Sequence, residues 1–195
     1  MEVSGVQKLA RVLRVLVLIT FVCNLIALFV VPCMAVLTPR GAAADLVEEL
    51  TYLLNRETWP ADRWPLSAVF VGSWILTWAS PYTAVLTLFL WACGICTAVI
   101  LWQAKRVLDT ILTGETFTFG NAANLKRAAV CCFVISGAAL TRTIWGLFFY
   151  RGIAALLTYN FLFVPLFLLA GLVCMVMSAL FRQAAELKAE NDLTI

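Results

Sequence analysis

The sequence predicts an all-α, polytopic membrane protein with four transmembrane helices and an outer amphipathic segment between the first two. Composition is the first reason. Apolar residues make up 63% of the 195 residues and charged residues 13%, whereas soluble domains are near half apolar and a quarter charged. Spacing is the second reason, because the apolar residues gather in four runs near the roughly 20 residues that a helix needs to cross a bilayer.

The four predicted spans have recognisable boundaries. They cover residues of about 15–37, 81–102, 128–150 and 160–181. The first run is longer than the apolar part of a secretory signal peptide, so we expect it to stay in the membrane, with cleavage near 42–44 as the alternative. Ser80 and Pro81 are suited to be the cap and the first residue of the second span. Gly137 and Thr141 are expected to let a neighbouring helix approach closely.

The distribution of Lys and Arg predicts the orientation, because these residues are enriched on the cytoplasmic side. With the N-terminus inside, the outer side holds four of them and the inner side holds Lys8, Arg11, Arg14, Lys105, Arg106, Lys126, Arg127, Arg182 and Lys188. We therefore predict one membrane domain, 1–195. Both termini, the inner loop 103–127 and the tail 182–195 are expected in the cytoplasm.

The outer loop, residues 38–80, has a pattern of its own. Residues 45–54 place apolar side chains on one helical face and acidic ones on the other, which predicts an amphipathic helix at the outer surface. Residues 66–80 are apolar but short, so they fit a re-entrant segment, an interfacial helix or an extension of the second span. Trp74 and Trp78 suit interface anchoring or, alternatively, contact with a ligand or lipid.

The residue content excludes most catalytic chemistry. The chain has no histidine, which removes the usual triads, most catalytic zinc sites and histidine acid–base catalysis. All seven cysteines lie in apolar runs, where a disulfide framework is not expected. No phosphate-loop, nucleophile-elbow or metalloprotease motif occurs, and a net charge of +3 is too small for nucleic-acid binding. We predict no enzyme activity, no catalytic residue, cofactor or metal, and no direct nucleic-acid contact.

Two features inside the spans leave alternatives open. Cys93 and Cys96 form a C-x-x-C pair typical of membrane thiol oxidoreductases, but no outer-loop cysteine is present as a relay, so packing is the favoured interpretation. Arg142 lies about 12 Å below the outer end of the third span, at 1.5 Å per residue. We expect its side chain to reach the headgroups or pair with an outer acid; a ligand or lipid-phosphate contact is the alternative.

A polar stretch separates the second and third spans. The second helix is expected to continue past the membrane and to end at Gly114, because glycine is common just after a helix. Thr118 is predicted to cap the next helix, with Asn121 at the position where a capping box carries Glu or Gln. Lys126 and Arg127 then lie at the inner headgroups. The stretch predicts a well-capped turn.

Two short motifs follow one another along the C-terminal part of the chain. The first is Gly114, Glu115, Phe117, Thr118 and Asn121, with Leu125, Lys126 and Arg127; the second is Phe181 and Arg182, then Leu187, Glu190, Asn191, Asp192, Leu193, Thr194 and Ile195. Because the two motifs occur in this order, the chain over about residues 81–195 resembles a bacterial family of four-span membrane proteins. The domain that these proteins share has no assigned function. The family often has Pro-Glu after the capping Thr, where this chain has Phe119-Gly120.

The resemblance implies a partner, since such proteins are commonly encoded beside a small Cro-type helix-turn-helix regulator. The apolar residues Leu187, Leu193 and Ile195 lie beyond the last span, where either the inner loop or a soluble partner would cover them. We predict a non-enzymatic sensor or regulatory protein that binds a cytoplasmic transcription regulator. The predicted contact residues are Gly114, Glu115, Phe117, Thr118, Asn121, Lys126, Arg127, Leu187, Glu190, Asn191, Asp192, Leu193 and Thr194.

Other functions stay open. A transporter of small molecules or peptides, or an immunity protein, would use Arg142, Trp74 and Trp78 and the aromatic outer loop. A membrane thiol oxidoreductase is the third interpretation. Besides the regulator, the predicted partners are the lipid bilayer and, left open, a second copy of the chain.

Overall fold

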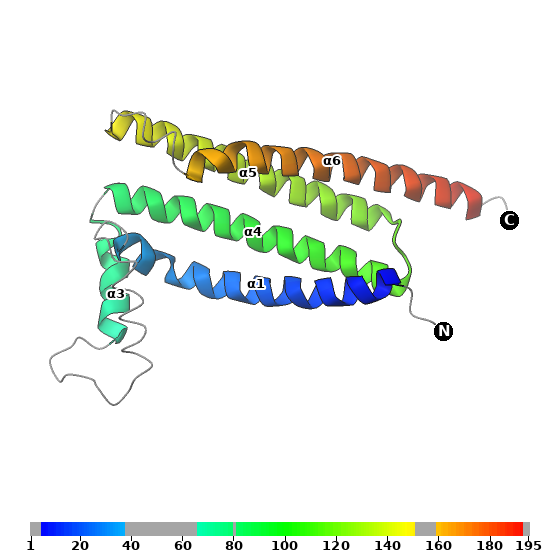
Figure 1. Cartoon of the computed structure of the whole chain (residues 1–195), viewed down its shortest axis with the longest axis horizontal. Coiled ribbons are helices and arrows are strands. Elements are labelled where there is room, and N and C mark those ends of the chain that lie inside the picture. Colours follow the sequence, from blue (N-terminus) through cyan, green and yellow to red (C-terminus); the bar gives the residue numbers. More distant parts are fainter. Residues whose placement is uncertain (1–4, 38–65, 80, 151–158, 193–195) are drawn as a thin grey trace. The chain divides into compact units, whose positions relative to one another are not determined.

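Every regular element in the described part of the chain is a helix. The computed structural model describes residues 5–37, 66–79, 81–150 and 159–192, and no strand occurs in these ranges. The helices are α1 (Gly5–Leu37), α3 (Leu66–Leu76), α4 (Pro81–Thr113), α5 (Phe119–Tyr150) and α6 (Tyr159–Asp192) (Figure 1). The predicted all-α class is confirmed. The predicted amphipathic helix 45–54 and the cap Ser80 lie outside the described residues.

Four helices, α1, α4, α5 and α6, are long and apolar enough to cross a membrane, so the chain is a multi-pass membrane protein as predicted. The last three contain 33, 32 and 34 residues. At 1.5 Å per residue each is about 50 Å long, against about 30 Å of hydrocarbon. Each helix therefore extends well past its apolar segment.

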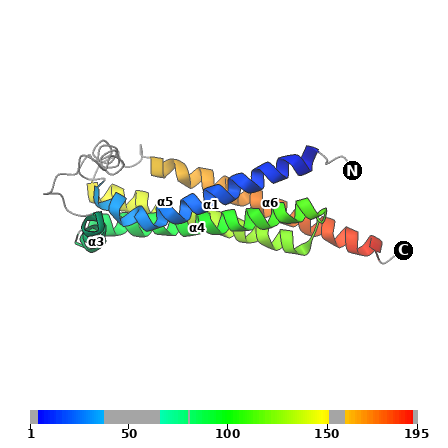
Figure 2. The ribbon, with the colours of Figure 1, turned by 90° about the horizontal axis from the view of Figure 1, so that it is seen from below.

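The chain divides into two compact units, residues 1–26 with 92–195 and residues 27–91. In the first unit, α5 and α6 lie side by side and run in opposite directions (Figures 1 and 2). Two hydroxyl groups join them. Ser136 Oγ donates to the Val164 carbonyl at 2.9 Å, and Ser178 Oγ donates to the Ala122 carbonyl at 2.7 Å. The two bonded residues of α5 are 14 residues apart, and so are the two bonded residues of α6. The alignment of the two helices is therefore the same at both bonds.

Helices α5 and α6 approach each other closely at Gly171. A Cβ atom there would lie 2.7 Å from Phe133 Cε1, which is below normal contact distance, so only glycine fits without movement of the ring. The predicted approach at Gly137 and Thr141 is wrong. Both residues are exposed, and nothing lies within 4 Å of a Cβ at Gly137, because α5 presents the neighbouring Ser136 to α6 instead.

The same unit joins the first part of α1 to the second part of α4. Arg14 Nε lies 2.8 Å from Asp109 Oδ1, and Lys105 Nζ lies 4.0 Å from Asp109 Oδ2. The rings of Phe21 and Trp102 have centroids 5.8 Å apart. The three charges therefore pair at one level of these helices, beside an aromatic contact.

In the second unit, a tryptophan replaces a hydrogen bond that proline removes. Pro32 lies inside α1 and has no N–H, so the carbonyl of Leu28, four residues earlier, loses its helical donor. Trp91 Nε1 donates to that carbonyl at 3.2 Å. In lipid this bond matters, because an unpaired carbonyl there costs several kcal/mol.

Residues 66–79 form an element separate from α4. Helix α3 ends at Leu76, Thr77–Ala79 form a turn, and α4 begins at Pro81, which excludes an extension of the second span. The Thr77 carbonyl accepts from Thr83 Oγ1 at 2.7 Å, which ties the turn to the start of α4. Pro81 thus begins its helix as predicted.

Candidate functional site

The turn between α4 and α5 ends the first helix with a glycine motif. Gly114 has φ of +85°, the left-handed region that favours glycine. Its N–H donates to the Ile111 carbonyl at 3.2 Å, and the Glu115 N–H donates to the Thr110 carbonyl at 3.0 Å. This pair of bonds is the Schellman motif, which satisfies carbonyls that a helix end otherwise leaves unpaired. The predicted helix end at Gly114 is confirmed.

The start of α5 is capped, and a buried asparagine ties the cap to α4. The Asn121 N–H donates to Thr118 Oγ1 at 3.2 Å, which confirms Thr118 as the cap. The Asn121 side chain is 1% exposed, and its Nδ2 donates to Thr110 Oγ1 at 2.6 Å and to the Thr116 carbonyl at 2.7 Å. Asn121 thus holds the position of the third residue of a capping box, but its amide side chain turns to α4 and the turn, where two acceptors lie.

An aromatic contact attaches the turn to α6. The rings of Phe117 and Phe181 have centroids 5.4 Å apart. Phe117 remains 50% exposed and Phe119 54% exposed. The turn and the end of α6 thus form one surface with two half-exposed aromatic rings, and we call Phe117, Phe119 and Phe181 the turn surface.

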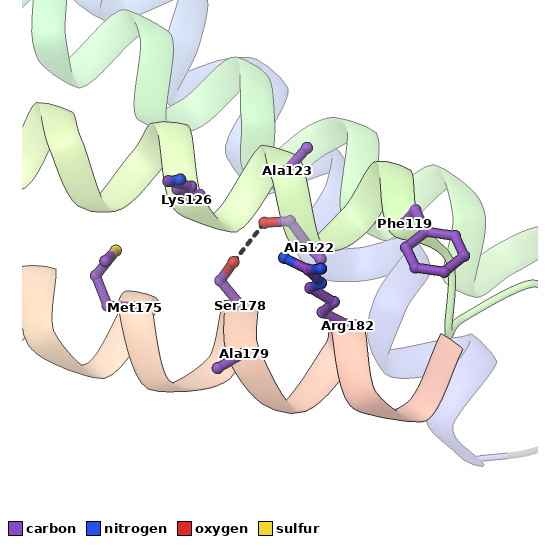
Figure 3. Close-up of a pocket in the computed structure, with 8 residues that line it drawn as sticks. All are labelled: Phe119, Ala122, Ala123, Lys126, Met175, Ser178, Ala179 and Arg182. Carbon is purple, nitrogen blue, oxygen red and sulfur yellow. Dashed lines mark hydrogen bonds between the residues drawn. The ribbon is translucent and has the colours of Figure 1, made fainter. Parts of the chain in front are cut away.

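A groove of about 430 Å³ lies beside this surface, between α5 and α6. Figure 3 shows Lys126 from α5 and Arg182 from α6 along it, with the bond from Ser178 to Ala122 between the helices. Its lining is otherwise small or apolar. The eight lining residues are Phe119, Ala122, Ala123, Lys126, Met175, Ser178, Ala179 and Arg182. We call this the α5–α6 groove.

A second hollow, also of about 430 Å³, borders the other side of Lys126. Its lining comes from α4 and α5 and consists of Val99, Ala123, Lys126, Arg127, Val130 and Cys131. Its charged side chains are the two cations. The adjacent bases Lys126 and Arg127, both exposed, therefore stand between two apolar hollows.

Comparison with known proteins matches residues 43–195 to a family described as "Protein of unknown function (DUF2975)". The match covers well over half of the chain. The chain belongs to this family. No curated protein and no solved structure matches the chain. The predicted membership in a family of membrane proteins without an assigned function is thus confirmed, and the match begins at residue 43 rather than near the predicted residue 81.

In this DUF2975 protein the predicted tail is the continuation of α6, which is helical to Asp192. Leu187 is 62% exposed, so the inner loop of the chain does not cover it. It lies seven residues after the exposed Leu180, nearly two helical turns, and so continues the outward apolar stripe of α6. Glu190 and Asn191 are exposed, and Leu193 and Thr194 lie outside the described residues. The exposure of Glu115 matches the predicted surface position.

The second predicted group of contact residues is divided between the two units. Arg142 is half-buried on α5 and lies close enough to Cys93 of α4 for an electrostatic interaction. Trp74 belongs to the other unit, where its ring lies 6.4 Å from Phe29 and 5.5 Å from Trp91. Trp78 is exposed in the turn after α3. Trp74 packs against these two rings, and a ligand or lipid role for Arg142, Trp74 and Trp78 stays a prediction.

Four of the cysteines lie in two pairs across neighbouring helices. All seven are free. Cys96 of α4 is hydrogen-bonded to Cys131 of α5, and Cys132 of α5 to Cys174 of α6. No group of three or more metal-ligating side chains occurs among the described residues. The adjacent residues Cys131 and Cys132 thus face two different helices, as expected for neighbours on a helix.

Sequence reasoning missed the α6 wall of the groove. Met175, Ser178 and Ala179 carry no motif, and Arg182 was considered only as an inner-side charge and as part of the second motif. The available signal was charge: Lys126 and Arg182 are the charges that flank the apolar segments of α5 and α6 on the same predicted side of the membrane. An antiparallel pair of helices brings such residues together.

Proposed function

We propose that this chain is a non-enzymatic regulatory protein of the bacterial cytoplasmic membrane that holds a soluble helix-turn-helix regulator at its turn surface. The observation that carries the proposal is the pair of half-exposed phenylalanines on a turn that is fixed on both sides. Helix α4 is closed by Gly114, α5 is capped by Thr118, and Asn121 joins them. Aromatic side chains held in one place are well suited to anchor a partner, because little conformational entropy is lost on binding.

The charge distribution supports a cytoplasmic position for this surface. Lys105, Arg106, Lys126 and Arg127 lie on the parts of α4 and α5 that flank the turn. Lys and Arg are enriched on the cytoplasmic side of membrane helices. The termini of α1 and α6 that carry Lys8 and Lys188 belong to the same side in a four-span topology. A C-terminal fluorescent fusion is expected to fluoresce, and a C-terminal alkaline phosphatase fusion to be inactive; the opposite pattern contradicts the orientation.

Photo-crosslinking in intact cells tests the partner. A photoreactive phenylalanine analogue replaces Phe117 or Phe119 in the full chain. The matched control replaces Val176, which is 60% exposed on α6 but lies within the apolar segment, where lipid is the expected neighbour. We expect a helix-turn-helix protein to be linked from positions 117 and 119 and not from 176.

The outcomes separate the proposal from a purely structural turn. If no soluble protein is linked from 117 or 119 while all three variants insert to the same level, the turn is only a helix connection. Equal links from 176 indicate non-specific capture and also contradict the proposal. Loss of the crosslink on Phe117→Ala in the position-119 variant would show that the two rings act together.

A further inference from the structure

We propose that the hollow between α4 and α5 binds an anionic phospholipid, with the phosphate at Lys126 and Arg127 and one acyl chain against the apolar wall. We call this site the α4–α5 hollow, and its lining residues are Val99, Ala123, Lys126, Arg127, Val130 and Cys131. The inference does not depend on the partner at the turn surface. Three properties of the hollow carry it: its two adjacent cations, the apolar wall beyond them, and its opening toward lipid.

The two cations of the hollow are available to an external anion. Lys126 and Arg127 are both exposed, and neither makes an ion pair or a cation–π contact with the residues that the structure describes. Both side chains line the α4–α5 hollow, and no carboxylate belongs to its lining. The two positive charges therefore act on one space, which favours an anionic headgroup over a zwitterionic one.

A second adjacent pair of Lys and Arg, on α4, provides the contrast. Lys105 and Arg106 lie over the Trp102 ring, at 4.9 Å and 5.9 Å from its centroid. Lys105 Nζ also lies 4.0 Å from Asp109 Oδ2. This pair carries the same two charges on the same predicted side of the membrane, but groups of the protein already contact it. It is therefore a matched control for charge.

The apolar wall lies beyond the cations, toward the apolar segment of α5. Val130 follows Lys126 by four residues, about 6 Å along α5 at 1.5 Å per residue. On α4, Val99 lies three residues from Cys96, which is hydrogen-bonded to Cys131 of α5. Because this bond aligns the two helices, Val99 lies within about one helical turn of the level of Val130. An acyl chain whose phosphate is held at the cations would run over these two valines.

The hollow opens onto an outward apolar side of α5. Val130 is 51% exposed, and Val134, about one turn further into the apolar segment, is 47% exposed. Exposed valines on a membrane-spanning helix are expected to face lipid, so a lipid can enter the hollow from the side without passing through water. A free phosphate would use the cations and leave the valines without a role.

The test is a lipid titration of the purified full chain in detergent micelles, read by native mass spectrometry. Phosphatidylglycerol and phosphatidylcholine share the phosphate and the acyl chains, but only the first has a net charge. Each basic residue near a membrane surface strengthens the attraction of anionic lipid about fivefold, so phosphatidylglycerol is expected to bind about 25-fold more tightly. Lys126→Gln/Arg127→Gln is expected to lose most of this preference, and the control Lys105→Gln/Arg106→Gln to keep it. Circular dichroism confirms that each variant keeps its helix content.

Two further arms test the apolar wall and the source of the phosphate. Val130→Trp fills the hollow without a change of charge, so the preference is expected to fall as in the Lys126→Gln/Arg127→Gln variant. Val134→Trp adds the same ring outside the hollow and is expected to leave the preference unchanged. Inorganic phosphate is expected not to displace the lipid.

Four results would overturn the proposal. The wild-type chain could bind the two lipids equally, or the two charge variants could lose the preference to the same extent. The two tryptophan variants could act alike, or inorganic phosphate could compete as an equal of phosphatidylglycerol.

Discussion

The hydrogen bonds of Asn121 are expected to hold the α4–α5 turn together, and Asn121→Ala tests this. The substitution removes two side-chain bonds of a residue that is 1% exposed, to Thr110 Oγ1 and to the Thr116 carbonyl. Each such bond contributes about 1 kcal/mol, and the carbonyl left without its donor adds to the loss. We expect the free energy of unfolding to fall by about 2–3 kcal/mol.

Equilibrium unfolding of the full chain in mixed micelles, followed by circular dichroism, measures this change. Thr141→Ala is the matched control, because Thr141 Oγ1 also makes a helix bond on α5, to the Gly137 carbonyl, but is exposed. Its effect is expected within about 0.5 kcal/mol of zero. If Asn121→Ala falls in the same range as the control, the network does not stabilise the turn, and the fixed position of the two phenylalanines loses its support.

Four other substitutions test the helix packing, the turn and the ion pair of Asp109 by the same unfolding measurement. Gly171→Ala is expected to lower the free energy of unfolding by about 1–3 kcal/mol, because the added Cβ meets Phe133. Gly137→Ala is the control and is expected to leave that free energy unchanged, because its Cβ meets nothing within 4 Å. Equal effects of the two variants would disprove the close approach. Gly114→Ala is expected to cost about 1 kcal/mol through its positive φ, and a neutral result would contradict that backbone conformation. Asp109→Asn removes a half-exposed ion pair, so the free energy of unfolding is expected to fall by less than about 1 kcal/mol, and by less still at high salt. A larger fall that does not depend on salt would refute this prediction.

The sequence was informative wherever a local rule decides the structure. Apolar runs of membrane length predicted the four spanning helices, and the helix-ending preference of Gly114 and the capping preference of Thr118 predicted the turn. These features depend on a few neighbouring residues and on the thickness of the bilayer. The separate helix α3 was left open because its apolar run is too short for length to decide among the alternatives.

Contacts between helices were less predictable, because they depend on the relative rotation of two helices. Gly137 and Gly171 look alike in sequence, yet only Gly171 faces a ring on the neighbouring helix. The side chain of Asn121 stands where a capping box would turn it back to the cap, but acceptors on α4 and in the turn compete successfully for it. The groove beside Lys126 needs, besides Arg182, three residues of α6 that carry no motif.

The equal spacing of the two serine bonds between α5 and α6 restricts how this pair can move. Sliding one helix by a full turn, about 5.4 Å, would break the bonds of Ser136 and Ser178 at the same time. A piston-like motion of α6 is therefore disfavoured, and the two helices are expected to pivot as one rigid body. Over a helix of about 50 Å, a pivot of about 10° displaces one end by about 9 Å relative to the other. Any tilt of the pair would thus be felt most as a lateral shift of the helix ends, one of which carries Leu187.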